Sequence, residues 1–284
     1  MEIPTPLPIS TPTIPPTDTP IPPSPTLIPC NPVAVDFCIT NGHFLFQSPI
    51  QTPDNDSVDL GYLYGSTQRR KREAHHGVEF QNASGTPVHA AEAGVVVFAD
   101  SDKVTKVSPW TDFYGNVVII RHANDLYTLY AHLSKILVQA GDEVDVGEII
   151  GEVGLTGAAI GSHLHFEVRK GGDGTDYFSI ENPVLWLIPH AGTGTLSITL
   201  KMDIEQNVER QLVVTYYADG NTDSTRIYYI SSYAAGFEHN AEDAALGELP
   251  PGRYRIAFND TVGTHERWVD VEAGKLTEVY FLVK

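Results

Sequence analysis

The chain has 284 residues, of which 42% are hydrophobic and 19% are charged, so it is long enough for one large domain or two modest ones. Its formal net charge of -18 argues against a nucleic-acid partner, because phosphate binding needs a basic face, and also against electrostatic attachment to an anionic membrane. No run of about 20 apolar residues is present, so we expect no transmembrane segment in this chain.

The first 29 residues are rich in proline and threonine. They hold 11 of the 20 prolines and 6 threonines. Proline has no amide donor and a locked φ, so this stretch is expected to form neither a helix nor a sheet. We predict a disordered linker or stalk over residues 1–29, of the kind found outside the cell. No export signal is visible after Met1, although the expected location is extracellular or the cell envelope.

A short lead-in segment, residues 30–57, contains the two cysteines of the chain, Cys30 and Cys38. They are separated by seven residues and lack the spacing of a zinc-binding pair. We predict a disulfide between them, which would indicate an oxidising compartment. The alternative is two unpaired thiols.

Residues 58–190 carry short runs rich in Val, Ile, Tyr and Phe, separated by glycines. Runs of this length and composition are typical of strands, and helical periodicity is nearly absent. We therefore predict a mostly antiparallel β domain, with strands in 94–99, 116–122, 126–133, 148–154 and 164–170.

The sequence pattern changes near residue 190, where the stretch HAGTGT (190–195) is typical of a linker. Further alternating runs follow, and they predict a separate β-sandwich over residues 194–284. Its segments LPPGRYRI (249–256) and VEAGKLTEVYFLV (271–283) resemble the last strands of transthyretin-like or carboxypeptidase-regulatory-like sandwiches. We find no catalytic constellation in this region.

The stretch GSHLHFEV (161–168) places two histidines two residues apart. In a strand, alternate side chains share a face, so His163 and His165 project together while Leu164 and Phe166 face the other way. Burying two neighbouring imidazoles is costly unless their lone pairs have a partner, and zinc coordination is the simplest way to provide one.

The stretch HHGVEF (75–80) adds a histidine and a carboxylate. If it is extended, His75 and Glu79 lie on one face, and Gly77 between them leaves the space above the strand open. Two imidazoles and a carboxylate are a common catalytic zinc set. His76 points the other way in a regular strand, so we assign it no ligand role.

Six motifs occur in a fixed order: HHGVEF, GTPVHA, YGNVVIIRH, YAHL, GDEVDVG and TGAAIGSHLHFE. Together they resemble the lysostaphin-type (LytM-like) zinc metallopeptidases, which cut peptide bonds in bacterial cell walls. The resemblance covers about residues 60–188 and includes neither the proline-rich stretch nor the C-terminal region.

The resemblance implies one zinc ion with His75, Glu79 and His165 as ligands. It also implies that His132, of YAHL, and His163 form the catalytic pair that faces the attacking water and the scissile carbonyl. The substrate would be peptidoglycan peptides. An imidazole can exchange a proton near neutral pH, because its ordinary pKa is about 6.5. A wall or surface contact through the C-terminal sandwich is a further expectation.

One position departs from the family pattern: Glu79 stands where the family usually has aspartate. Glutamate is one methylene longer, and zinc accepts either carboxylate. The chain is thus expected to be a zinc endopeptidase. The alternative is a weak or inactive relative that binds the wall or regulates another wall hydrolase. Three other features keep two interpretations each. His122 either only ends its strand or also supports the groove, and Tyr62 and Tyr64 either pack or line the rim. Residues 69–73 are either a solvated loop or contact an anionic part of the substrate.

Overall fold

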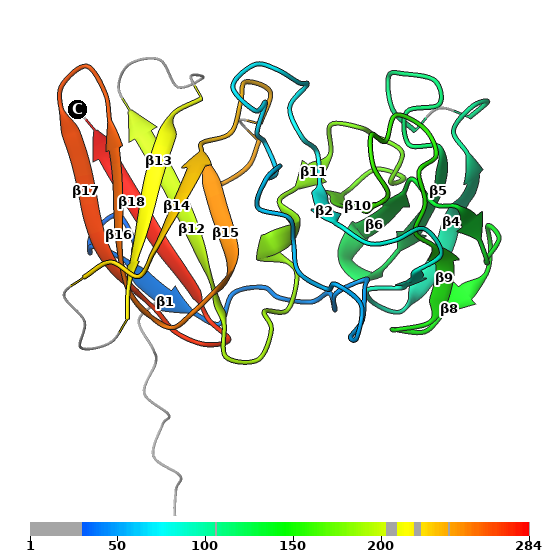
Figure 1. The fold of residues 1–284 in the computed structure, drawn as a ribbon, viewed down its shortest axis with the longest axis horizontal. Helices are drawn as coiled ribbons and strands as arrows, with labels where there is room; N and C mark the ends of the chain where they lie inside the picture. Colours follow the sequence, from blue (N-terminus) through cyan, green and yellow to red (C-terminus); the bar gives the residue numbers. More distant parts are fainter. Residues whose placement is uncertain (1–29, 106, 203–208, 219–222, 238, 284) are drawn as a thin grey trace, which may run out of the picture. The chain divides into compact units, whose positions relative to one another are not determined.

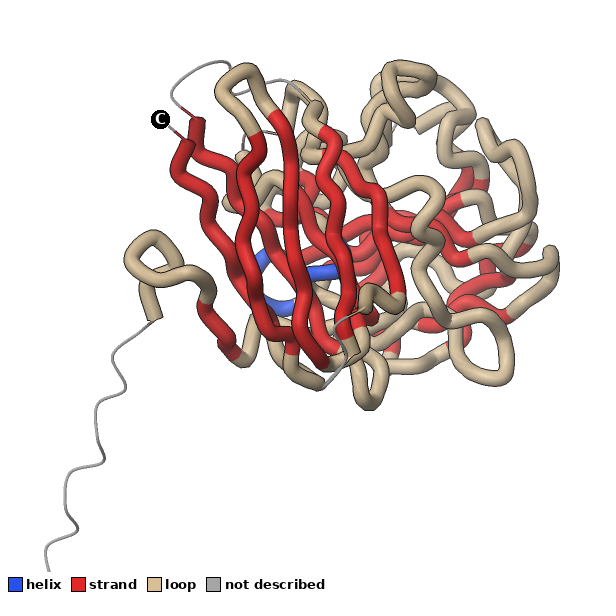
Figure 2. Tube along the Cα trace, turned by 60° about the vertical axis from the view of Figure 1, so that its left-hand side comes forward, coloured by secondary structure: helices blue, strands red, loops and turns tan. Residues whose placement is uncertain are grey.

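The computed structural model describes residues 30–283 apart from 106, 203–208, 219–222 and 238. The predicted linker or stalk, residues 1–29, lies outside the described residues. Strands and loops make up nearly all of the rest, and helix is confined to two single 3₁₀ turns, η1 (Ala123–Asp125) and η2 (Pro183–Leu185) (Figure 2). The predicted mostly β fold is confirmed.

The larger sheet has seven strands, and β10, next to one edge, pairs with three of them: β2, β6 and β11 (Figure 1). From β6 the sheet continues through β5 and β4 to β8, with antiparallel pairing throughout. The members are β2 (Val78–Phe80), β4 (Gly94–Ser101), β5 (Asn116–Arg121), β6 (Leu126–Ala131), β8 (Glu143–Val144), β10 (Leu164–Lys170) and β11 (Ile180–Glu181). A small sheet joins β3 (Pro87–His89), β9 (Ile149–Glu152) and β7 (Lys135–Ile136).

The alternation along β10 separates two kinds of side chain. Leu164, Phe166 and Val168 are fully buried in an apolar core on one face of the sheet. The opposite face carries His165, Glu167 and Arg169, which are also buried. The core thus fixes the register of β10 and, through it, the direction in which the polar side chains point.

The C-terminal region consists of two four-stranded sheets that share one apolar core, which agrees with the predicted sandwich. One sheet has the order β14-β13-β16-β17, and the other β1-β18-β12-β15, with β12 and β18 parallel. The strands are β12 (Gly194–Met202), β13 (Gln211–Tyr217), β14 (Arg226–Ser231), β15 (Ala244–Leu249), β16 (Gly252–Asn259), β17 (Thr264–Val271) and β18 (Leu276–Val283). The likeness to transthyretin-like sandwiches stays a prediction.

The lead-in segment contributes to the C-terminal sheet, because β1 (Cys38–Thr40) pairs with the start of β18. Both cysteines are disulfide-bonded, so the predicted bridge is confirmed, and it suggests an extracytoplasmic location. Among the described residues, no helix has the length and apolar character that a membrane crossing would need.

Candidate metal centre

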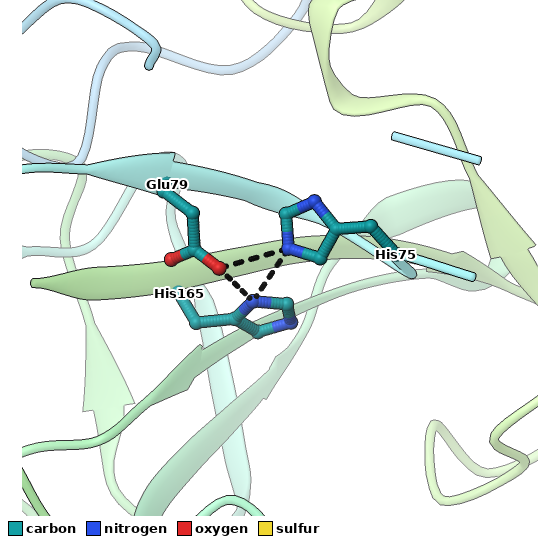
Figure 3. A group of neighbouring side chains, drawn as sticks. All are labelled: His75, Glu79 and His165. Atoms are coloured by element: carbon teal, nitrogen blue, oxygen red, sulfur yellow. Dashed lines mark hydrogen bonds and ion pairs between the residues drawn. The ribbon is translucent and has the colours of Figure 1, made fainter. Parts of the chain in front are cut away.

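Strand register brings two of the predicted ligands together. In the antiparallel pairing of β2 with β10, the Cα atoms of Glu79 and His165 are direct partners. His75 precedes β2, which is shorter than the extended stretch we predicted, yet its ring turns toward the same point (Figure 3). Three side chains from two distant parts of the sequence therefore converge, as the spacing of the motifs indicated.

The converging atoms lie close together and are buried. His75 Nε2 is 2.8 Å from Glu79 Oε1 and 3.2 Å from His165 Nδ1. The third side of the triangle, from His165 Nδ1 to Glu79 Oε1, is 3.1 Å (Figure 3). In the described part of the chain, these three residues form a group whose ligand atoms are close enough to hold a metal ion.

The other ring nitrogens determine where the lone pairs point. His75 Nδ1 donates to the carbonyl oxygen of Tyr62 at 2.9 Å, so its Nε2 lone pair faces the cluster. His165 Nε2 donates to Glu167 Oε1 at 3.0 Å, which directs Nδ1 to the same point. A divalent cation fits this donor set, because two imidazole nitrogens and a carboxylate oxygen all face one position.

Glu79 uses both oxygens in the site. Oε1 faces the two ligand histidines, whereas Oε2 is buried without an aligned hydrogen bond and lies 2.9 Å from His163 Nε2. Burial raises the pKa of Glu79, but the histidines around it outweigh burial and hold the pKa well below its usual value. The carboxylate is therefore ionised and available as a ligand.

The pKa of His165 indicates whether its imidazole is protonated when no cation is bound. Burial lowers it, but the carboxylates of Glu79 and Glu167 prevail and raise the pKa of His165 to about 9. The metal-free cluster thus retains a proton near neutral pH. Binding of a divalent cation would release it, because metal ligands must be deprotonated.

A second layer of buried polar groups supports His165. Glu167 Oε2 accepts from Arg169 Nε at 2.7 Å, and Arg169 also donates to the hydroxyl of Tyr114 at 2.9 Å. Tyr114 in turn donates to Glu167 Oε1. Burial raises the pKa of Glu167, but Arg169 and His165 outweigh it and keep that pKa far below its usual range. Glu167 therefore stays ionised and fixes the ring of His165.

The absence of a side chain at Gly77 leaves room for His165. A Cβ atom there would lie 2.4 Å from the carbonyl oxygen of Phe166 and 2.9 Å from the imidazole of His165. Such contacts are too short to accommodate. The open space predicted above the strand is thus occupied by a metal-ligand ring.

The two remaining histidines stand beside this cluster. His132 Nδ1 donates to Thr156 O at 2.9 Å, so its Nε2 carries the lone pair. His163 Nδ1 donates to Gly161 O at 2.6 Å, and its Nε2 lies 2.9 Å from Glu79 Oε2. Their ring centroids are 4.9 Å apart, and that of His132 is 5.7 Å from that of His165. The structure therefore brings all five predicted site residues together.

His132 adopts a backbone conformation that non-glycine residues rarely take. Its φ is 62°, directly after β6 ends at Ala131. Strained residues of this kind cluster at functional sites. Burial, followed by the nearby His165 and His163, lowers the pKa of His132 to about 3, so its imidazole is neutral at physiological pH.

A cavity of about 570 Å³ opens over the cluster. Its walls come from the loop that precedes β2, the loop before β5 and the loop before β10. The lining includes the aromatic rings Tyr62, Phe113, Tyr114 and Tyr177 and the charged side chains Asp59, Arg72 and Glu73. A cavity of this size suits a short peptide segment better than a single small ion.

Other residues singled out from the sequence have diverse positions. Tyr62 lines the cavity and stacks on His75 at 3.9 Å, whereas Tyr64 is buried in a separate aromatic cluster. His76 stacks on Tyr177 instead of joining the ligands, in line with its predicted lack of a ligand role.

His122 forms hydrogen bonds with Ala93 O and the Thr128 hydroxyl, so the structure does not place it at the groove. Of residues 69–73, Arg72 and Glu73 line the cavity.

Glu167 and Arg169 were not predicted as site residues from the sequence. The signal was present, because HLHFEVR places a charged residue at every second position after His163. Alternation in a strand puts all of these on one face. Tyr114 could not be found this way, since it comes from a loop before β5 and meets Glu167 only in the folded chain.

The comparisons with known proteins concern the same stretch. Residues 73–177 match the model of peptidase family M23. The chain is 44% identical over 109 residues to "DD-carboxypeptidase/endopeptidase Mpg" of Neisseria meningitidis, covering 38% of this chain and 23% of that protein. It is 35% identical over 137 residues to "Peptidoglycan DD-endopeptidase ShyA" of Vibrio cholerae, covering 48% and 30%. The chain therefore spans less than a third of the length of either relative.

Among solved structures, the catalytic domain of the prophage-encoded M23 protein EnpA from Enterococcus faecalis matches with 29% identity and a TM-score of 0.40, covering 49% of this chain and 95% of that one. The converging His75, Glu79 and His165 lie within the part of the sequence that matches the family model. Residues 73–177 are therefore similar to peptidase family M23, and within this stretch the three converging side chains form a metal site of the zinc type.

Proposed function

We propose that this chain is a zinc-dependent endopeptidase that hydrolyses peptide bonds of bacterial peptidoglycan. The observation that carries the proposal is the meeting of two imidazole nitrogens and a carboxylate oxygen within 3.2 Å, beside two further imidazoles. The names of the relatives, which include a peptidoglycan DD-endopeptidase, support peptidoglycan peptides as the substrate and favour DD linkages.

In this proposal His75, Glu79 and His165 hold one zinc ion. When bound, zinc supplies Lewis acidity that activates water near neutral pH and stabilises developing negative charge. His163 and His132 exchange the protons through Nε2, because a backbone carbonyl fixes each ring through Nδ1. The aromatic walls of the cavity bind the peptide and exclude water from it.

The test is metal content together with cell-wall or glycyl-peptide cleavage, measured for the wild type and for His163→Ala. We expect about one zinc per chain in both proteins. Hydrolysis by His163→Ala should be about 10²- to 10⁴-fold slower, the usual contribution of a positioned acid or base. A wild-type protein that binds no metal and cleaves nothing would refute the enzyme assignment.

The alternative function is a weak or inactive relative that binds the wall or regulates another hydrolase. Glu79→Asp decides between the two, because it restores the residue usual in the family. If the longer carboxylate of Glu79 suits the site, then Glu79→Asp should change the rate by less than about 10-fold. A large gain in hydrolysis would favour the alternative.

The C-terminal sandwich is proposed to contact the wall or another surface. Its outer face carries Trp268 next to Tyr217, with ring centroids 5.1 Å apart, and Arg253 over the Trp268 ring. Exposed aromatic side chains beside a cation are suited to sugar rings or anionic polymers. Loss of wall sedimentation in Trp268→Ala would support this role, and unchanged sedimentation would remove it.

The location is proposed to be extracellular or the cell envelope, which the disulfide supports. The domain limits stay as predicted: a peptidase domain over 58–190, an accessory sandwich over 194–284, and a lead-in over 30–57. Limited proteolysis followed by mass measurement would check them, since cleavage should concentrate between residues 190 and 194.

A further inference from the structure

Outside the metal cluster itself, the ligand His75 contacts one neighbouring segment, residues 62–66, through its ring and its backbone. The His75 ring stacks on Tyr62 and donates to its carbonyl oxygen. The His75 backbone amide donates to Ser66 O at 3.1 Å, and the Gly65 amide donates to His75 O at 2.7 Å. Both the position and the tautomer of this ligand therefore depend on where residues 62–66 lie.

Residues 62–66 are in turn held by the C-terminal region. Asn31–Lys284 pack as one compact unit, and within it the loop between β14 and β15, residues 232–243, reaches this segment. The amide of Ala234 donates to Gly65 O at 2.9 Å. The ring of Tyr233 lies so close to Gly65 that a Cβ atom at Gly65 would be 2.4 Å from it.

Aromatic contacts extend this interface to both sides of His75. Tyr64 packs edge-on against Tyr233 and Phe237, each at 5.1 Å between ring centroids. The same Phe237 packs edge-on against His76, the residue after the ligand, at 5.4 Å. These contacts belong to a buried hydrophobic cluster that contains Tyr64, Tyr233 and Phe237.

The loop 232–243 is itself firmly anchored. The hydroxyl of Tyr233 donates to Glu242 Oε1 at 2.8 Å and accepts from Asn182 Nδ2 at 2.6 Å. His239 Nε2 donates to the carbonyl oxygen of Ile180 at 2.7 Å, and Asn240 donates to the Tyr64 hydroxyl at 2.9 Å. These four hydrogen bonds, two of them buried, fix the position of the loop and of the residues that it contacts.

We propose that Tyr233 and Phe237 of the C-terminal region are positioning residues for the metal ligand His75. The C-terminal sandwich then does more than carry the enzyme to a surface: its 232–243 loop completes the wall behind the metal site. This inference rests on the proposed function, because it assumes that His75 binds zinc. No residue of the loop touches the metal position itself.

The test compares the zinc dissociation constants of full-length proteins, measured by competition with a chromogenic chelator. Tyr233→Ala and Phe237→Ala should each weaken zinc binding by about 10-fold, the lower end of the effect of removing a group that orients a ligand. Tyr233→Phe and Phe237→Leu keep the apolar bulk against Gly65 and His76, so they should retain most of the affinity.

A matched control is Val269→Ala, which opens a cavity in the core of the sandwich far along the sequence from the loop. It should lower the melting temperature without changing zinc affinity. Hydrogen exchange provides a readout independent of metal: in the metal-free proteins, the amides of Gly65 and His75 should exchange faster in Phe237→Ala than in Val269→Ala.

Wild-type zinc affinity and unchanged amide protection in both alanine variants would overturn the inference. A wild-type protein without zinc affinity would instead refute the proposed function. In that case the exchange of Gly65 and His75 still decides whether the C-terminal loop positions this segment.

Discussion

The seven-stranded sheet and the C-terminal sandwich bury different chemistry. On β10 of the large sheet, His165, Glu167 and Arg169 are all buried on one face. In the described residues of β12 to β18, the buried polar side chains are hydroxyls alone: Thr195, Ser197, Thr215 and Thr277. Buried charges cost stability unless they are paired, so a stable β core does not need them. Their presence in one sheet marks the region that the protein uses for chemistry.

The largest effect is expected when the charge that supports His165 is removed. Glu167→Gln leaves Arg169 buried without its ionic partner, which typically costs about 3–5 kcal/mol of stability. It also weakens the support of a ligand, so zinc affinity should fall by about 10- to 100-fold. Thermal unfolding and chelator competition measure the two effects.

The matched change in the sandwich is Phe258→Ala, which empties part of its hydrophobic cluster. It should lower stability by a similar amount, about 3–5 kcal/mol, through the cavity it leaves. Its zinc affinity should equal that of the wild type. If Phe258→Ala weakened zinc binding as much as Glu167→Gln, then the two regions would not differ in the way we infer.

A smaller effect is expected from one added methyl group in each region. In Gly77→Ala, the new Cβ would press on the carbonyl of Phe166 and the ring of His165, which should cost about 1–3 kcal/mol and reduce zinc affinity. In Gly247→Ala, on β15, the nearest atom would be Val184 Cβ at 3.4 Å, an ordinary contact. Equal zinc affinities in the two variants would contradict the role assigned to Gly77.

The smallest effect concerns pH. Burial raises the pKa of Glu242, whose carboxylate accepts from Tyr233 and lies near Glu181 and Asp243. The folded protein then binds this proton more tightly than the unfolded chain, so stability is full below the ordinary pKa and falls as pH rises through the raised pKa. Glu242→Gln should raise the melting temperature slightly at about pH 7 and leave it unchanged at about pH 4. A gain of equal size at both pH values would exclude this cause.

The strands that carry the site could be predicted from the sequence, because alternation and β-branched residues mark β5, β6 and β10 clearly. The five site residues could also be predicted, since His163, His165, His75 and Glu79 lie in two compact motifs and His132 in a third. Strand pairing then determines their meeting, through the register of Glu79 with His165.

Other features depend on contacts that no local pattern records. β15 (AALGEL) is hard to predict from the sequence, because its small residues carry little strand preference. The stacking of Tyr62 on His75 and the support of Gly65 by Tyr233 join segments that are distant in sequence. A glycine at position 65 predicts a turn, but the residues around it in the sequence do not indicate that the ring of Tyr233 packs on it.

The pairing of Cys38–Thr40 with residues 276–278 has a consequence for biosynthesis. On the ribosome, the strand that contains Cys38 emerges more than 200 residues before its partner, and the whole M23 stretch is translated in between. Residues 73–177 can collapse before the last strand of the chain has been synthesised. Nascent chains arrested before residue 276 should therefore leave the strand at Cys38–Thr40 open to proteases, and release of the finished chain should protect it.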